Sequence, residues 1–191
     1  MSKNIKKQQE NKYKKNKRKK ERLERIKNIA FEVIIIGIVV LALLLLFKSK
    51  VKIRTKPIGD QKTIEGREHI STTQKNKKYK TNPPTSGAHY GTAQPGGFYN
   101  RSIQDENAVH SLEHGYIWIT FKDQPKNVLD ELKKIAKRYP YRVVISYRKE
   151  NDSPLALASW GRLLKLNNFD KKKIMEFIEN NYNRSPEKLA K

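Results

Sequence analysis

The sequence predicts an α+β protein in which a single transmembrane helix precedes a small domain built on a mixed β-sheet. Three observations predict it: an unbroken apolar run near the N-terminus, short segments rich in β-branched and aromatic residues further on, and helical apolar spacing between two of those segments. Of the 191 residues, about 135 remain for this domain once a tail and a span are subtracted. We therefore expect one hydrophobic core.

The apolar run suits a membrane span. Residues 33–47 are apolar apart from Gly37, and residues 29–47 are interrupted only by Glu32. At about 1.5 Å per residue, this length matches the roughly 30 Å core of a bilayer. A cleaved signal peptide is the alternative, but such peptides end in a small-residue cleavage site, whereas this run ends among lysines. We expect a transmembrane helix over residues 29–47.

The positive charge is distributed unevenly. The net charge is +23, and residues 1–27 hold 13 Lys or Arg against 3 Glu, while residues 57–191 hold 24 against 15 acidic residues. More than half of the excess lies outside the predicted domain, so the charge does not indicate a nucleic-acid partner. Under the positive-inside rule, it places the N-terminus in the cytoplasm and the C-terminal domain outside the cell.

Four segments follow from these patterns. Residues 1–28 are a basic cytoplasmic tail, disordered or a helix lying on the membrane surface, because they contain too few apolar residues to form a core. Residues 29–47 are the span, residues 48–61 a basic linker, and residues 62–191 an extracytoplasmic domain. The chain has no cysteine, which excludes a disulfide framework, a thiolate metal site and a thiol nucleophile.

The predicted domain begins with a loop-rich region and continues with regular elements. Prolines and glycines mark residues 70–105 as mostly irregular. The composition of residues 116–121 and 143–147 favours strands, and the residues after Pro125 have helical spacing up to Tyr139. A strand, a helix and a strand in this order favour a parallel crossover unit. Residues 155–160 indicate a further strand, and a second flanking helix begins at Asp170.

All four histidines lie in or beside the loop-rich region, and they are His69, His89, His110 and His114. His110 and His114 are four residues apart, so a short helix would place both rings on one face, where they can share a metal ion. We expect a metal centre that uses these histidines, with Glu113 or Glu68 as a further ligand or acid–base group. Imidazole suits zinc, copper, iron or nickel, and zinc or copper is the expected ion. The alternative is that these side chains only pack loops against the sheet.

One short motif suggests catalysis. His110-x-x-Glu113-His114 matches the pattern of inverted zinc peptidases, in which two histidines bind zinc and the glutamate activates water. Glu113 is therefore the candidate catalytic residue. The motif requires a sustained helix, however, and Gly115 followed by a strand-like run disfavours one here.

Two longer motifs carry a family resemblance. Asn82-Pro83-Pro84-Thr85-Ser86-Gly87-Ala88-His89-Tyr90 and Val109-His110-Ser111-Leu112-Glu113-His114-Gly115 stand in that order, and Ala158-Ser159-Trp160-Gly161-Arg162 follows. The chain resembles the uncharacterised bacterial family called domain of unknown function 3105, from about Glu68 to Glu187. The resemblance implies an anchored or exported domain and places the four histidines and Glu113 at family motif positions. It implies no activity, and Ala88 stands where proline is usual.

Other motif residues have two interpretations each, one functional and one structural. Pro83-Pro84 and Ser86-Gly87 would present His89 at the mouth of the site, or would form a structural loop. Arg101 and Arg162 would bind an anionic ligand, or lie in solvent. A set of aromatic residues would line a pocket or belong to the core, and these are Tyr90, Phe98, Tyr99, Tyr116 and Trp118.

These observations predict a membrane-anchored extracytoplasmic domain that binds a divalent transition metal through histidines. The alternative is a non-catalytic scaffold of the cell envelope, which binds an envelope protein or an anionic wall polymer by its basic surface. A metal-dependent hydrolase is a third hypothesis. The sequence offers no evident nucleophile, so it leaves open whether the protein is an enzyme.

Overall fold

The protein was analysed as a computed structural model, which describes residues 2–50, 56–74 and 78–187. The chain divides into two compact units, Met1–Ile53 and Arg54–Lys191.

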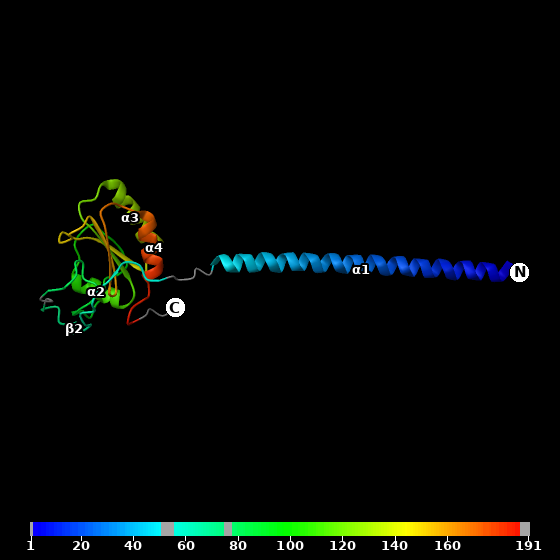
Figure 1. Ribbon diagram of the computed structural model, residues 1–191, viewed down its shortest axis with the longest axis horizontal. Helices are drawn as coiled ribbons and strands as arrows, with labels where there is room; N and C mark the ends of the chain where they lie inside the picture. The colour runs from blue at the N-terminus through cyan, green and yellow to red at the C-terminus, as the bar shows by residue number, and fades with distance from the viewer. Residues whose placement is uncertain (1, 51–55, 75–77, 188–191) are drawn as a thin grey trace. The chain divides into compact units, whose positions relative to one another are not determined.

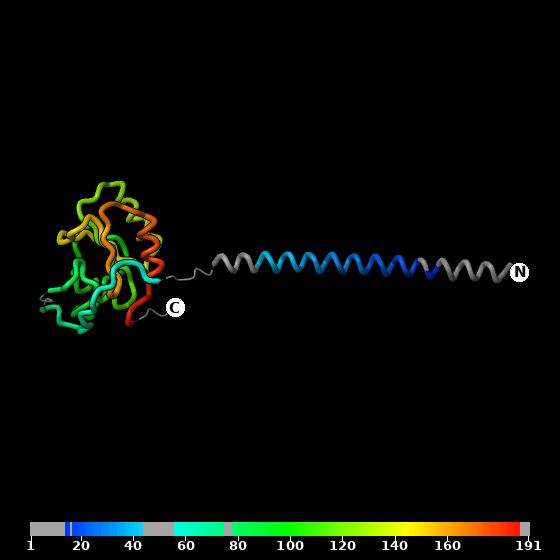
Figure 2. Tube along the Cα trace, in the orientation of Figure 1, coloured from blue at the N-terminus to red at the C-terminus, as the bar shows by residue number. Residues whose placement is uncertain are grey.

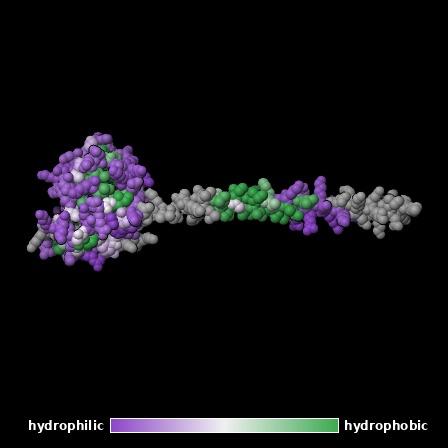
Figure 3. Space-filling model, viewed as in Figure 1, coloured by the Kyte–Doolittle hydropathy of each residue, from purple (hydrophilic) through white to green (hydrophobic). Residues whose placement is uncertain are grey.

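The first unit is one long helix, α1 (Ser2–Lys50). Within it, Lys17–Leu43 is long and apolar enough to cross a membrane, a property that a signal sequence near the N-terminus shares. Figure 3 shows this apolar stretch as a green band that follows the hydrophilic, purple part of the helix. Among the described residues, one helix is therefore suited to a span, in the region that the sequence predicts.

Of the two forms expected for the tail, the structure has the helical one, since α1 is helical from Ser2. Lysine, arginine, glutamine and glutamate all have good helix propensity, and extending an existing helix avoids a new nucleation step. Of the predicted linker 48–61, residues 48–50 end α1 and residues 60–61 form a strand, while residues 51–55 lie outside the described part of the chain.

The second unit is built on a six-stranded mixed sheet with the strand order β1-β8-β7-β5-β6-β4. The strands are β1 (Asp60–Gln61), β4 (Gly97–Tyr99), β5 (Ile117–Phe121), β6 (Val143–Tyr147), β7 (Leu155–Ser159) and β8 (Arg162–Leu166). β6 pairs in parallel with both β4 and β5, whereas β5, β7, β8 and β1 pair antiparallel in succession. The α+β class predicted from the sequence is confirmed.

Helices cover both faces of this sheet. Ile117 and Ile119 of β5 pack in the same cluster as residues of α3 (Lys126–Arg138) and α4 (Lys171–Asn181). Trp118, between them, packs with Ala108 and Leu112 of α2 (Asp105–Glu113) on the opposite face. This alternation is expected where neighbouring side chains of a strand point to opposite faces. Figures 1 and 2 show α3 and α4 together on one side of the strands and α2 on the other.

The regular elements of the C-terminal half agree with the sequence. The predicted strand, helix and strand are β5, α3 and β6, and the two strands pair in parallel with Ile119 opposite Ile145. Asp170 caps α4 by accepting a hydrogen bond from the backbone N–H of Lys173 at 3.0 Å. α2 was expected only as a possible short helical stretch, and β8 was not predicted.

The loop-rich region contains a second, two-stranded sheet. β2 (His69–Ile70) and β3 (His89–Tyr90) pair in parallel, with His69 opposite His89. These strands are only two residues long, too short to produce a recognisable pattern of alternation. They nevertheless place two histidines side by side, and both belong to the candidate site.

Candidate metal centre

Three elements bring four potential metal ligands together. β2 supplies His69, β3 supplies His89, and α2 supplies His110 and Glu113. One ligand atom of each side chain lies within 4.8 Å of those of all the others. The ring centroids of His69, His89 and His110 are 5.0 to 5.2 Å apart.

The proline-containing loop places His89 in the interior. The side chain of His89 is 0% exposed, and its backbone N–H donates to the carbonyl of Glu68 at 3.0 Å. Ser86 and Thr85 of the loop are buried as well. The expectation that His89 lies at the mouth of the site is therefore wrong, because its ring packs among Glu113, His69, His110 and Trp160.

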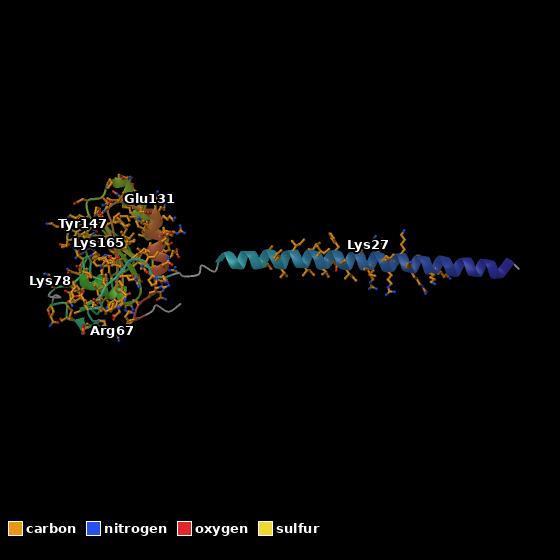
Figure 4. All side chains as sticks on the ribbon, viewed as in Figure 1. Lys27, Arg67, Lys78, Glu131, Tyr147 and Lys165 are labelled. Carbon is orange, nitrogen blue, oxygen red and sulfur yellow. The ribbon has the colours of Figure 1, made fainter. Side chains whose placement is uncertain are left out.

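His69 is the exposed member of the cluster. Its side chain is 53% exposed, and it lies on the short strand β2 at the edge of the domain. Figure 4 labels Arg67, two residues earlier in the chain, at this same edge. Solvent therefore reaches the cluster from the side of His69.

Both nitrogens of the His89 ring have a partner. Nδ1 lies 2.7 Å from the backbone carbonyl of Gly87, and Nε2 lies 3.0 Å from Oε2 of Glu113. Because a carbonyl can only accept, Nδ1 carries the proton of this contact. Nε2 faces Glu113, so it shares a proton with Oε2 of Glu113 or, where a cation replaces that proton, offers its lone pair to the cation.

Glu113 is the acidic member at the centre of the cluster. Its side chain is 1% exposed, and its Oε2 lies 3.6 Å from Nε2 of His69 as well as close to His89. A buried carboxylate is costly unless positive charge or hydrogen bonds compensate it. Here the neighbouring groups are imidazoles. They can compensate the carboxylate by donating hydrogen bonds or by holding a cation next to it.

His110 and His114 lie on one face of α2 and at its end, as their spacing predicts. Their Nε2 atoms are 2.8 Å apart and their ring centroids are 4.6 Å apart. Nδ1 of His110 is buried and has no hydrogen-bond partner among the described residues. An unpartnered buried nitrogen is unusual, and it is a donor atom that a cation could satisfy.

Burial lowers the pKa of His110. The neighbouring rings of His114, His89 and His69 lower the pKa further, and the carboxylate of Glu113 opposes them. Desolvation and like charges both disfavour the imidazolium form. These contacts therefore favour the neutral form of His110, and a neutral imidazole is the form that binds a metal.

The C-terminal segment 183–187 packs against the end of α2. The backbone N–H of Asn183 donates to the carbonyl of Gly115 at 2.8 Å, and that of Glu187 donates to the carbonyl of Glu113 at 3.2 Å. Glu187 thereby lies beside His114, with its Oε2 3.6 Å from Nδ1 of the ring. The resemblance extends to Glu187, but nothing in the sequence assigned this residue to the site.

The remaining predicted residues lie outside the cluster. Glu68 is exposed and contributes its backbone carbonyl to His89, but it is not a member of the group of potential ligands. Arg162 donates to the carbonyl of Gly59 at 3.0 Å, which ties β8 to the segment before β1. Arg101 is exposed and lines an open depression together with the start of α2.

The predicted aromatic residues belong to the core or its margin. Trp118 is fully buried and donates from Nε1 to Oγ of Ser146 at 2.9 Å. Phe98 stacks on Phe121 with 5.5 Å between ring centroids. An aromatic side chain that does touch the site is Trp160, whose ring meets His89 edge-on at 6.3 Å. Its place in the Ala-Ser-Trp-Gly-Arg motif was the available signal.

The residues present fit a transition-metal ion. Three imidazoles and a carboxylate are a donor set found at zinc and copper sites. In tetrahedral coordination, ligand atoms about 2.0–2.2 Å from a zinc ion lie about 3.3–3.6 Å from one another, so ligand atoms at the observed limit of 4.8 Å would have to approach each other by about 1.2–1.5 Å. The Gly87 carbonyl on Nδ1 of His89 matches the outer contact that orients most metal-bound histidines.

The fold and the cluster define a class of protein: an N-terminal apolar helix followed by an α+β domain with a buried group of histidine and glutamate. Comparison with known families matches residues 69–191 to the family described as protein of unknown function, DUF3105. The chain belongs to this family. No curated protein and no solved structure matches the chain.

Proposed function

We propose that this protein is a membrane-anchored extracytoplasmic domain that binds one divalent transition-metal ion, zinc or copper, through His69, His89, His110 and Glu113. The observation that carries the proposal is the convergence of these four side chains within 4.8 Å from three separate elements. The buried, unpartnered Nδ1 of His110 supports it. His114, which the sequence favoured as a ligand, contacts His110 and is not a member of this group.

The alternative of a purely structural polar cluster predicts different chemistry. In that case the four side chains would satisfy one another by hydrogen bonds and would gain little from a cation. Nδ1 of His110 has no hydrogen-bond partner among the described residues, and a missing partner at a buried polar atom costs about 1–3 kcal/mol. A bound ion would remove this cost, which favours the metal hypothesis.

Metal content tests the proposal directly. The full chain, purified without a polyhistidine tag and stripped with a chelator, should take up one zinc ion per molecule on dialysis. Binding to the folded state should raise the free energy of unfolding by about 2.7 kcal/mol at a free zinc concentration of 100 times Kd. A protein that takes up no zinc and no copper, with an unchanged melting temperature, would exclude the proposal.

Glu113→Gln separates binding from catalysis. If Glu113 is a ligand, the variant binds zinc more weakly, because an amide is a poorer ligand than a carboxylate. The hydrolase hypothesis, in which Glu113 activates water, instead predicts that zinc binding persists while cleavage of a peptide library is lost. Glu131→Gln is the matched control, since Glu131 lies on α3 and pairs with Lys134 and Lys171, and it should leave zinc binding unchanged.

A second function is supported by surface charge. Residues 57–191 hold 24 Lys or Arg against 15 acidic residues, and this excess of positive charge suits an anionic envelope polymer, although the lysines at Lys133, Lys134, Lys171 and Lys173 each pair with an acidic side chain. Purified teichoic acid is a suitable probe. Binding that weakens with salt and survives His89→Gln would support this scaffold role, and binding that does not respond to salt would count against it.

A further inference from the structure

The contact between His114 and Glu187 raises the question of which ring nitrogen of His110 can bind the ion. Nε2 of His110 lies 2.8 Å from Nε2 of His114, which is hydrogen-bond distance. When both rings are neutral, one of these two nitrogens carries the proton of the bond and the other accepts it. Either His110 donates to His114, or His114 donates to His110. The two cases leave different nitrogens of His110 with a lone pair.

Glu187 distinguishes the two cases. Its carboxylate lies 3.6 Å from Nδ1 of His114, and a nearby negative charge favours a proton on that nitrogen. A neutral His114 with its proton on Nδ1 has a lone pair on Nε2, so it accepts from His110. His110 then carries its proton on Nε2, and its Nδ1 has a free lone pair.

The burial of His110 agrees with this assignment. Nδ1 of His110 is buried and lacks a hydrogen-bond partner among the described residues. If Nδ1 carried the proton, a buried donor would be left without an acceptor. If it carries a lone pair, the atom is ready to bind a cation.

We propose that His114 and Glu187 are positioning residues outside the coordination sphere, which hold His110 in the tautomer that presents Nδ1 to the metal. This inference rests on the proposed metal function and specifies its ligand atoms. His89 is held with the opposite nitrogen toward the ligands, because the Gly87 carbonyl accepts from Nδ1, while Nε2 lies 3.0 Å from Oε2 of Glu113, where a bound ion would replace the proton between the two atoms. The centre therefore combines one histidine that binds through Nδ1 with one that binds through Nε2.

The backbone of the C-terminal segment fixes Glu187 in this role. Hydrogen bonds from Asn183 to Gly115 and from Glu187 to Glu113 join the segment to both sides of His114. Gly115, with φ of +86°, is required for this approach, since an added Cβ would lie 2.7 Å from Cα of Asn183. The segment thus couples the end of the chain to the geometry of the centre.

Ring-nitrogen NMR tests the assignment. The chain has only four histidines, so the full chain labelled with ¹⁵N-histidine in detergent micelles gives eight ring-nitrogen signals. Without metal, His110 should be protonated on Nε2 and bare on Nδ1. With zinc added, Nδ1 of His110 and Nε2 of His89 should shift as ligands, and neither nitrogen of His114 should. A ligand shift at His114, or at Nε2 of His110, would overturn the inference.

Variants separate positioning from general stability. Glu187→Gln and His114→Gln should each give a mixture of His110 tautomers and weaken zinc binding by about 10- to 100-fold, with one zinc still bound at saturation. Glu187→Asp should restore part of the affinity. Glu176→Gln, an exposed carboxylate of α4, should change neither quantity. Unchanged tautomer and zinc affinity in both variants would refute the role of His114 and Glu187.

The metal-free spectra keep the two proposals distinguishable. If zinc shifts no ring nitrogen and the chain takes up neither zinc nor copper, the proposed metal function fails. If zinc binds but the metal-free His110 carries its proton on Nδ1, the metal function stands and the positioning role fails.

Discussion

At the scale of a single residue, Gly115 is a position at which the structure requires glycine. It lies directly after His114, donates to the carbonyl of Leu112 and accepts from Asn183. Its positive φ is costly for any residue with a side chain. The sequence motif ends on this glycine for two reasons, since it terminates α2 and it admits the C-terminal segment.

Gly115→Ala should destabilise the domain. A Cβ atom would meet Cα of Asn183 at 2.7 Å and Oγ of Ser185 at 3.0 Å, in a backbone conformation already unfavourable for alanine. We expect a loss of about 1–3 kcal/mol in urea denaturation. Gly91→Ala is the control, because its Cβ would meet no atom closer than 3.9 Å, and equal effects of the two substitutions would contradict the argument.

The buried position of His110 makes the metal-free protein sensitive to acid. Burial, followed by the neighbouring histidines, lowers the pKa of folded His110 below its ordinary value of 6.5. The unfolded chain then binds the proton more readily than the folded chain, so stability is lost as pH falls below 6.5 toward the lower, folded pKa. Stability above pH 6.5 is unaffected by this group.

Urea denaturation of the metal-free chain between pH 8 and pH 5 measures the effect. The wild-type protein should lose more stability over this range than His110→Gln, whose amide does not titrate. If the free energy of unfolding falls equally in both proteins between pH 8 and pH 5, protonation of His110 does not destabilise the folded chain.

At the scale of an element, α2 connects the site to the core. One side of the helix, with Ala108 and Leu112, packs on the sheet around Trp118, and the other positions hold His110 and Glu113. Its nine residues are few for an independent helix. Packing on the sheet therefore keeps the two ligands of α2 in place.

Leu112→Ala should weaken both the fold and the site. Truncating a fully buried leucine costs about 2–5 kcal/mol, and here the loss falls directly beneath two ligands. The matched control is Ile174→Ala in α4, which is equally buried but packs on the opposite face of the sheet. Calorimetry should find similar losses of stability in both variants, with weaker zinc binding only in Leu112→Ala. Equal zinc affinities in the two variants would show that the packing of Leu112 does not affect zinc binding.

At the scale of the whole molecule, the location of the second unit decides which substrates or metals it can meet. The charge of the tail predicts that residues 62–191 lie outside the cell. The absence of cysteine from the chain makes the orientation directly measurable, because any introduced cysteine is the only one.

Single-cysteine labelling tests anchoring and orientation together. A membrane-impermeant maleimide should label Lys172→Cys in intact cells, and should label Lys20→Cys only after the membrane is opened. Both positions are exposed within their units. Labelling in the reverse order would contradict the orientation, and a secreted product lacking its N-terminus would identify the apolar helix as a signal sequence.

The sequence alone determined the features that depend on local pattern. The apolar run, the strand, helix and strand around α3, and the helix after Asp170 follow from the period of apolar residues, which reflects which face of each element is buried. The sequence did not determine the secondary structure of the tail, because composition does not show whether a polar segment continues a neighbouring helix. α1 does so from Ser2.

Tertiary structure decided the features that depend on pairing between distant segments. Two-residue strands such as β2 and β3 have no period to detect, yet their register places His69 beside His89. The sequence identified the four histidines and Glu113 through motifs and spacing, but only the fold showed that His89 is buried, that Glu113 lies among the imidazoles, and that Glu187 meets His114. Contacts of this kind join residues far apart in the chain, and no local pattern encodes the distance between them.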